Sequence, residues 1–208
     1  MPDEPGQPDP EPLLQRAQAG DDGALGELLQ LYRPYLSLLA RLKADRKMQA
    51  KLDDSDLVQD TCLSAHRDFH QFRGATEHQF TAWLREIMAH AAANRTRYQR
   101  RERRDMRLEQ QLSVELNESS QMIERALIHP ASSPSHSAAR RERAVLLANA
   151  LSRLQADYRE VLVLRELEGK SLNEAAQCMG RSPDAVQKLW ARALVQMRRL
   201  MQSSLEMS

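Results

Sequence analysis

The sequence predicts an all-α protein of two small helical domains joined by a flexible linker. Strong helix formers dominate the 208 residues, with 30 Leu and 26 Ala against only 14 Val, Ile and Thr together. Five of the nine prolines fall in the first 12 residues, so the body of the chain is nearly free of helix breakers. Apolar residues recur there at three- and four-residue steps, which is the period of an amphipathic helix.

The first predicted domain spans residues 13–112 and follows an acidic, Pro-rich tail over 1–12 that we expect to be disordered. An apolar stripe at helical spacing opens the domain, and Pro34 inside it should kink the helix or divide it. Asp53, Asp54 or Ser55 can cap a second helix that runs to about Phe69. After a loop at Gly74, a third helix carries the stripe Phe80, Trp83, Leu84, Ile87, Met88 and Ala91, and continues into an Arg-rich run.

Residues 113–139 predict a linker. Ser119, Ser120 and four serines over 132–137 cluster there with Pro130 and Pro134, a composition typical of loops. Ile123 and Leu127 favour a short helical turn within it.

The second predicted domain spans residues 140–204 and has clear helix signals. Ser171 and Glu174 form a capping box that starts a short helix, and Gly180 provides a left-handed stop. A longer basic helix then begins, with Ser182 as its N-cap and Pro183 as its first helical residue.

A short helix, a tight turn and a longer basic helix make a helix-turn-helix, whose second helix enters a DNA major groove. Gln can read adenine and Lys or Arg can read guanine at base edges, while early backbone amides suit phosphate. The candidate DNA-binding residues are Arg181, Ser182, Asp184, Gln187, Lys188 and Arg192. The alternative is a helical hairpin that binds no DNA.

The net charge of +1 hides a strong asymmetry. Residues 95–107 carry seven arginines against two acids, whereas residues 53–60 carry four aspartates and no base. This pattern indicates contacts with a polyanion and with at least one basic partner. The alternative is that each charge run only solvates its helix.

Several classes of protein are excluded or disfavoured. No apolar run reaches the length of a membrane span, the acidic N-terminus is unlike a signal peptide, and two distant cysteines make no disulfide framework. No phosphate loop, zinc-protease motif or nucleophile elbow is present, so we expect no enzyme, catalytic residue or cofactor. Cys62, His66 and His70 spread over ~12 Å of helix, too far for one metal ion. The cytoplasm is the expected location.

Three segments resemble the extracytoplasmic-function (ECF) sigma factors, the small type within the sigma-70 family. Asp157–Met201 (DYREVLVLRELEGKSLNEAAQCMGRSPDAVQKLWARALVQMRRLM) resembles region 4. Asp56–Gly74 (DLVQDTCLSAHRDFHQFRG) resembles region 2.2, and Phe80–Arg101 (FTAWLREIMAHAAANRTRYQRR) is similar to the next two segments. The resemblance covers about residues 13–200 in the family's order. The segment KADRKMQAKLDDSD and the Ser-Pro linker also resemble the planctomycete-type branch.

The resemblance implies a partner for each segment. Region 2.2 docks on the β′ clamp helices of core RNA polymerase through Asp56, Leu57, Gln59, Asp60 and Thr61. The segment Phe72–Gln79 captures an unpaired base of the minus-ten promoter element. The following helix faces promoter DNA at the melted start through Asn94, Arg95, Arg97, Tyr98, Arg100 and Arg101. Region 4 reads the minus-thirty-five element and contacts the β flap, and an anti-sigma factor is a further expected partner.

The predicted function is therefore that of a sigma factor, which binds core polymerase, directs it to promoters and promotes melting, without insertion into a membrane. Two alternatives remain open from the sequence. A stand-alone helix-turn-helix regulator explains residues 140–204 equally well, but leaves the acidic face and the Arg-rich run without a role. A helical adaptor that binds only protein would use its arginines as solvated faces.

Overall fold

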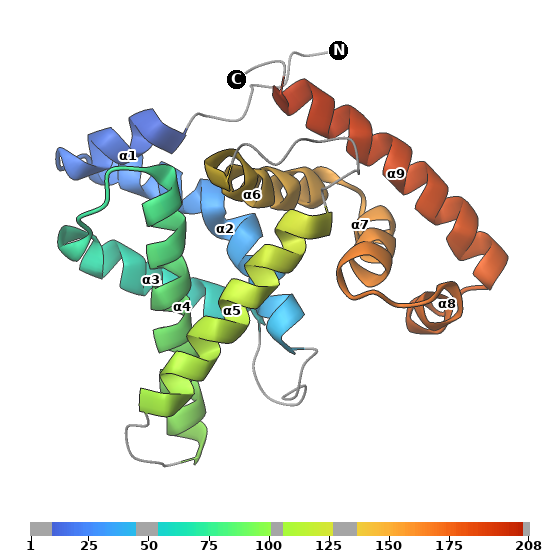
Figure 1. Ribbon diagram of the computed structural model, residues 1–208, viewed down its shortest axis with the longest axis horizontal. Coiled ribbons are helices and arrows are strands. Elements are labelled where there is room, and N and C mark those ends of the chain that lie inside the picture. Colours follow the sequence, from blue (N-terminus) through green and yellow to red (C-terminus); the bar gives the residue numbers. More distant parts are fainter. Residues whose placement is uncertain (1–9, 45–53, 101–105, 127–136, 206–208) are drawn as a thin grey trace.

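The computed structural model describes residues 10–44, 54–100, 106–126 and 137–205, and their regular structure is entirely helical (Figure 1). This confirms the all-α prediction. The helices are α1 (Pro10–Gln18), α2 (Asp22–Ala44), α3 (Asp54–Asp68), the short η1 (Phe69–Gln71), α4 (Glu77–Arg100), α5 (Met106–Ala126), α6 (Ser137–Arg153), α7 (Ala156–Leu162), the π-helical turn η2 (Val163–Leu167), α8 (Leu172–Met179) and α9 (Pro183–Leu205).

Helix α2 lies at the centre and packs against α1, α3, α5 and α6. Its inward side chains Tyr32, Tyr35, Leu36 and Leu39 are completely buried. Pro34 lies within this helix and does not divide it. The chain therefore tolerates the missing amide of Pro34 inside one continuous element.

An aromatic cluster joins α2, η1 and α4. The ring of Phe80 lies edge-on to Tyr32 with centroids 5.1 Å apart, and Phe72 and Trp83 lie within 6 Å of Phe80. Phe69 completes the cluster by stacking on Phe72. The predicted stripe of α4 faces this core, because Phe80, Leu84 and Met88 are completely buried.

Helix α5 corrects the predicted linker. Residues 113–126 belong to this helix, which packs against α4, α2 and α6. Leu112, Leu116 and Ile123 are buried, so the segment has a regular apolar stripe despite its serines. Ser119 satisfies its hydroxyl by donating to the backbone oxygen of Glu115, four residues earlier. The predicted turn around Ile123 is thus part of a helix of 21 residues.

The ends of the predicted segments shift in two further places. Helix α1 begins at Pro10, inside the tail predicted over 1–12, since proline is tolerated in a first helical turn. Helix α6 begins at Ser137, before the predicted boundary at 140. Residues 1–9 and 127–136 of the tail and linker lie outside the described residues. The division into two domains stays a prediction.

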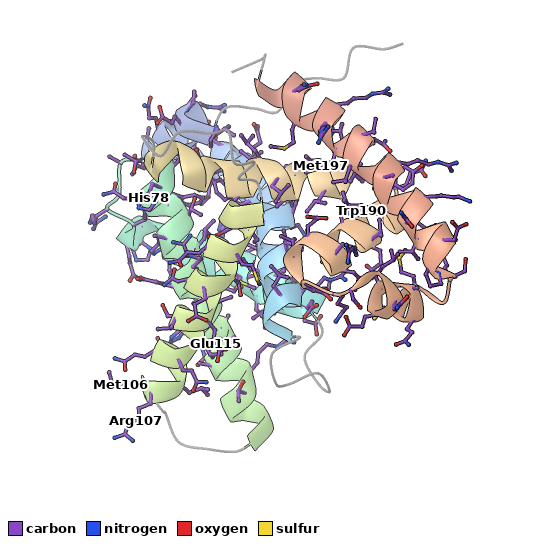
Figure 2. The ribbon with its side chains drawn as sticks, turned by 45° about the vertical axis from the view of Figure 1, so that its right-hand side comes forward. His78, Met106, Arg107, Glu115, Trp190 and Met197 are labelled. Carbon is purple, nitrogen blue, oxygen red and sulfur yellow. The ribbon has the colours of Figure 1, made fainter. Side chains whose placement is uncertain are left out.

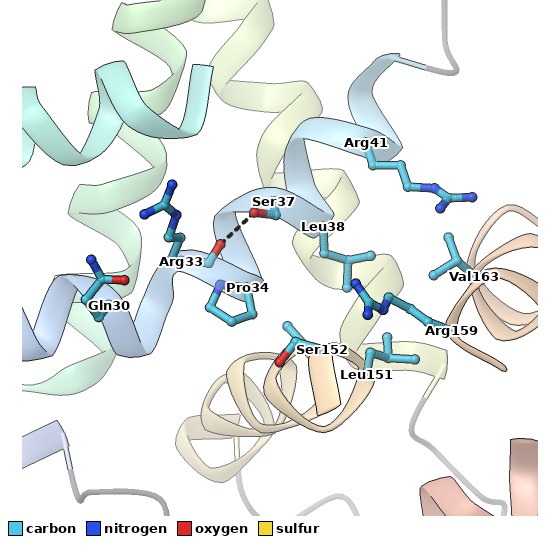
Figure 3. A pocket seen from close by; sticks show the side chains of 11 residues that line it. Gln30, Arg33, Pro34, Ser37, Leu38, Arg41, Leu151, Ser152, Arg159 and Val163 are labelled. Carbon is cyan, nitrogen blue, oxygen red and sulfur yellow. Dashed lines mark hydrogen bonds between the residues drawn. The ribbon is translucent and has the colours of Figure 1, made fainter. Parts of the chain in front are cut away.

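The N-terminal helices α2, α4 and α5 pack against α6, and α5 also packs against η2. Arg41 on α2 donates to both carboxylate oxygens of Glu160, at 2.6 and 2.9 Å, and to Glu168 at 2.9 Å. Asn149 on α6 donates to the backbone oxygen of Leu31 at 3.1 Å. Beside these contacts, Pro34, Leu38 and Leu151 line a hollow of about 450 Å³ between α2 and the corner of α6 and α7 (Figure 3).

The buried stripe of α5 can be tested by truncation. We expect Leu116→Ala to lower the free energy of unfolding by ~2–5 kcal/mol, because it leaves a cavity where the side chain is completely buried. Val114→Ala, on the exposed face of the same helix, should change it by less than ~0.5 kcal/mol. Denaturant unfolding measures both. Equal, small effects would show that this segment is not part of the core.

Candidate nucleic-acid and protein interfaces

The five predicted polymerase-binding residues of α3 separate into two groups. Asp56, Gln59 and Asp60 lie on the outer face, where the side chains of Asp56 and Asp60 are 55% and 47% exposed. Leu57 and Thr61 instead lie in the core, and the Thr61 hydroxyl donates to the backbone oxygen of Leu57 at 2.7 Å. These two residues therefore hold the helix in place, and the exposed acidic face consists of Asp56, Gln59 and Asp60.

Leu63 lies on the same face of α3 and is 62% exposed, although it is not among the five residues predicted for this face. Helical geometry turns each residue by about 100°, which places Leu63 close to Asp56 and Gln59 and opposite the middle of the buried face, which consists of Leu57, Val58, Thr61 and Ala65. This position was readable from the sequence, because Leu63 is out of register with the apolar stripe. It borders a groove between α3 and α4 of about 750 Å³, lined by Asp60, Leu63, Ser64, Arg67, Ala91, Asn94 and Arg95.

The loop that enters α4 is held in a fixed shape. Gln18 on α1 donates to the backbone oxygen of Gly74 at 2.6 Å, and the Gln79 side chain accepts from the amides of Ala75 and Thr76. A Cβ at Gly74 would lie only 2.5 Å from the ring of Phe72, so the loop packs closely against the aromatic cluster. The segment predicted to capture an unpaired base therefore presents exposed Arg73 and Thr76 on a loop that is hydrogen-bonded at both ends and packed against the core.

The predicted DNA-binding end of α4 is only partly described. Asn94 is exposed, whereas Arg95 is half-buried and directed toward α3. Arg97, Tyr98 and Arg100 belong to the helix, but their side chains lie outside the description, and Arg101 lies outside the described residues. Helix α5 begins close to this end, with Met106 and Arg107 projecting from its first turn (Figure 2).

The predicted helix-turn-helix is present in α8 and α9, with its predicted caps. The Ser171 hydroxyl accepts from the amide of Glu174, and the Glu174 carboxylate accepts from the amide of Ser171 at 2.7 Å. Hydrogen bonding to the carboxylate by the side chain and by the amide of Ser171 lowers the pKa of the Glu174 carboxyl. Gly180 is left-handed, with φ of 62°, and the Ser182 hydroxyl accepts from the amide of Ala185 at the start of α9.

All six candidate DNA-binding residues of this motif are exposed: Arg181, Ser182, Asp184, Gln187, Lys188 and Arg192. Two of them are paired on the protein surface, because Arg181 contacts Asp157 at 2.5 Å and Lys188 contacts Asp184 at 2.8 Å. Both pairs are open to solvent, so a phosphate or base edge can replace the carboxylate at small cost. The first turns of α9 therefore present basic and amide side chains together.

The opposite face of α9 packs against α7 and α8. Val186 and Ala193 are completely buried, and Met197 lies on the same side (Figure 2). Trp190 on this helix is only partly buried: its indole donates to Glu166 at 2.8 Å and Arg165 lies over its ring. The polar indole nitrogen explains this edge position, since it needs a partner when covered.

No group of three or more His, Cys, Asp and Glu in the described part of the chain is arranged to hold a metal ion. Cys62 is half-buried, and burial raises the pKa of its thiol. Within the same ranges, no helix combines the length and the apolar content that crossing a membrane requires.

The known proteins to which this chain is similar include several RNA polymerase sigma factors. RNA polymerase sigma factor NccH of Alcaligenes xylosoxydans xylosoxydans is 29% identical over 194 residues, which cover 93% of this chain and 95% of that protein. ECF RNA polymerase sigma factor ShbA of Streptomyces griseus subsp. griseus is 30% identical, covering 90% of this chain and 93% of that protein. The solved structure of CnrH in complex with the cytosolic domain of CnrY is 25% identical, covers 94% and 99% of the two chains, and has a TM-score of 0.33.

The family assignment follows from the length of the match. Residues 10–203 match the profile of the family described as ECF sigma factor, so the match includes the acidic α3 face, the Arg-rich end of α4 and the helix-turn-helix. The chain therefore belongs to the ECF sigma factor family of transcription initiation factors.

Proposed function

We propose that the protein binds core RNA polymerase through the exposed acidic face of α3 and reads promoter DNA with the end of α4 and with α9. The observation that carries this proposal is the exposure of the six residues at the capped start of α9, on a helix whose other face is buried. Backbone amides and basic side chains at a helix N-terminus suit phosphate and base edges. Membership of the ECF sigma factor family identifies core RNA polymerase as the protein partner. Its β′ clamp helices and β flap are the expected contact sites.

Charge supports the assignment of the α3 face to protein. Asp56 and Asp60 are acidic and exposed, and Leu63 beside them is apolar and exposed. An acidic face with an apolar centre fits a basic protein surface and repels DNA. We propose Leu63 as an additional contact of this face.

The mechanism is one of binding and positioning. The N-terminal helices would attach to polymerase and hold unpaired promoter DNA, which favours melting, while α9 would anchor the upstream duplex. No step requires a catalytic residue or a cofactor, so we propose that the protein is not an enzyme. Action with polymerase places it in the cytoplasm. An anti-sigma factor is the further partner that the family resemblance implies, and we propose that such a sequestering protein regulates this chain.

Run-off transcription with purified core polymerase and a promoter library tests the proposal. Transcription that depends on the added protein, from a defined set of promoters, would support a sigma factor. DNA binding without any effect on polymerase would favour a stand-alone regulator, and the absence of salt-dependent DNA binding would favour a protein adaptor.

The α3 face is tested by Asp56→Arg combined with Gln59→Ala. We expect the affinity for core polymerase to fall about tenfold or more, because the charge reversal faces a basic partner. Glu27→Arg, an equal charge change at an exposed position of α2, is the control and should bind as the wild type does. Competition with a labelled sigma factor for core polymerase measures both. Normal competition by the double variant would remove the assignment of this face to polymerase.

The recognition helix is tested by Lys188→Ala and Arg192→Ala. Removing a side chain that binds a base edge should cost ~1–3 kcal/mol and relax the preference at one promoter position, whereas removing one that binds phosphate should weaken all sequences equally. Arg198→Ala, the same charge change farther along α9, is the matched control. Transcription from promoters altered in the upstream element distinguishes a loss of preference at one position from a uniform loss over all sequences. An identical response of all three variants would contradict the groove placement of α9.

The Arg-rich end of α4 is tested by replacing Arg97, Arg100 and Arg101 together with Ala. We expect thermal stability to stay within ~1 kcal/mol, as for surface substitutions. The salt slope of DNA binding should fall by up to ~0.7–0.9 for each phosphate that the variant no longer neutralises, and promoter opening should decrease. Melting temperature, affinity against salt and permanganate reactivity measure these effects. A large loss of stability with an unchanged salt slope would show that the run packs against protein.

A further inference from the structure

Two surfaces that the proposed function gives to different partners meet at one ion-paired cluster. The Arg95 guanidinium on α4 donates through Nη2 to Asp56 at 2.9 Å, and its Nε lies 3.4 Å from the carboxylate of Asp60. Both aspartates belong to the acidic face proposed for polymerase, and Arg95 belongs to the helix proposed for DNA. The cation and the two anions are therefore partners of one another in the protein alone.

The arrangement leaves Arg95 poorly placed for a phosphate. Its side chain is only 25% exposed, whereas the two aspartates are about half exposed. One positive charge lies between two negative charges, so the cluster as a whole repels a polyanion. The third guanidinium nitrogen, Nη1, is buried and has no hydrogen-bond partner in the described structure. Arg95 thus has an unused donor, while the side chain as a whole remains bound to α3.

We propose that Asp56 and Asp60 mask Arg95 from nucleic acid, and that a basic group of the polymerase, by binding these carboxylates, releases it to bind promoter DNA. This inference rests on the proposed function for both partners. A basic group on the polymerase competes with Arg95 for the carboxylate oxygens of Asp56 and Asp60. Polymerase binding therefore raises the affinity of the protein for DNA. By linkage, DNA that binds Arg95 favours polymerase on the aspartates by the same factor.

The size of the coupling between polymerase binding and DNA binding depends on how strongly Arg95 binds the half-exposed carboxylates of Asp56 and Asp60. Exposed ion pairs contribute ~0.2–1 kcal/mol, which corresponds to about a 1.4- to fivefold change in affinity for each pair. The effect is therefore a modest increase in affinity that depends on salt, and both partners still bind without it.

The masking is tested on the free protein with a labelled oligothymidine strand as the probe. We expect Asp56→Asn with Asp60→Asn to raise the affinity about two- to fivefold at low salt, and to steepen the salt slope by up to ~0.7, the value for one phosphate contact on a single strand. Adding Arg95→Ala to this double variant should abolish both gains. Melting temperatures confirm that the variants are folded.

Removal of negative charge can by itself favour DNA, and two comparisons isolate that effect. Glu27→Gln with Glu86→Gln removes the same charge from exposed positions of α2 and α4 that lie outside the cluster. A gain that persists in the Arg95→Ala background, or that the Glu27 and Glu86 control reproduces in full, would overturn the proposal.

A second measurement separates this inference from the proposed function. Arg95→Ala should tighten binding to core polymerase by about two- to fivefold, because the partner no longer competes with an internal cation, and should have no such effect when Asp56 and Asp60 are Asn. If Arg95→Ala binds core polymerase with unchanged or weaker affinity, Arg95 does not compete with the polymerase for the two aspartates and the proposal is overturned. If the two Asn substitutions leave polymerase binding unchanged, the polymerase assignment of the α3 face fails, while the oligothymidine measurements still decide whether the aspartates mask Arg95.

Discussion

Two tyrosine hydroxyls on α2 are buried, and the packing of the N-terminal helices depends on giving each of them a partner. The Tyr32 hydroxyl donates to Glu77 at the start of α4 at 2.7 Å, and the Tyr35 hydroxyl donates to Ser120 on α5 while it accepts from Arg85 on α4. A buried hydroxyl without a partner costs ~1–3 kcal/mol, so α4 and α5 have one favourable position along α2. Burial, with the nearby Glu77 carboxylate, raises the pKa of Tyr32 and keeps its proton on the donor.

Local signals in the sequence predict the helix ends and the apolar faces well. The capping box at Ser171, the left-handed Gly180 and the stripe beginning at Phe80 each depend on neighbours within one helix, and each is present. The helix-turn-helix and the exposure of its reading residues follow from the same local rules. The all-α fold class and the residue at which α9 begins were therefore predictable without knowledge of any long-range contact.

The failed linker prediction and the ion pairs that the sequence did not indicate all involve contacts between distant parts of the chain. Ser119 and Ser120 indicated a linker because serine is common in loops, yet Ser120 is the partner that the buried Tyr35 requires. The resemblance assigns Arg95 to DNA, which stays a prediction, and its partners in the protein alone are on α3, 39 and 35 positions earlier. Arg41 likewise gave no local signal for its contacts with Glu160 and Glu168. Pairs of this kind become visible only when the helices are placed together.

The contacts of α6 have a consequence for the movement of the C-terminal helices. Helix α6 packs against α2, α4 and α5 and also against α9, so it connects α9 to the N-terminal helices. The ion pairs of Arg41 with Glu160 and Glu168 form a second connection. A movement of α6 and α9 away from α2 therefore has to break the Arg41 pairs as well as the packing of α6. Because both sets of contacts lie within one chain, the equilibrium of such a movement does not depend on protein concentration.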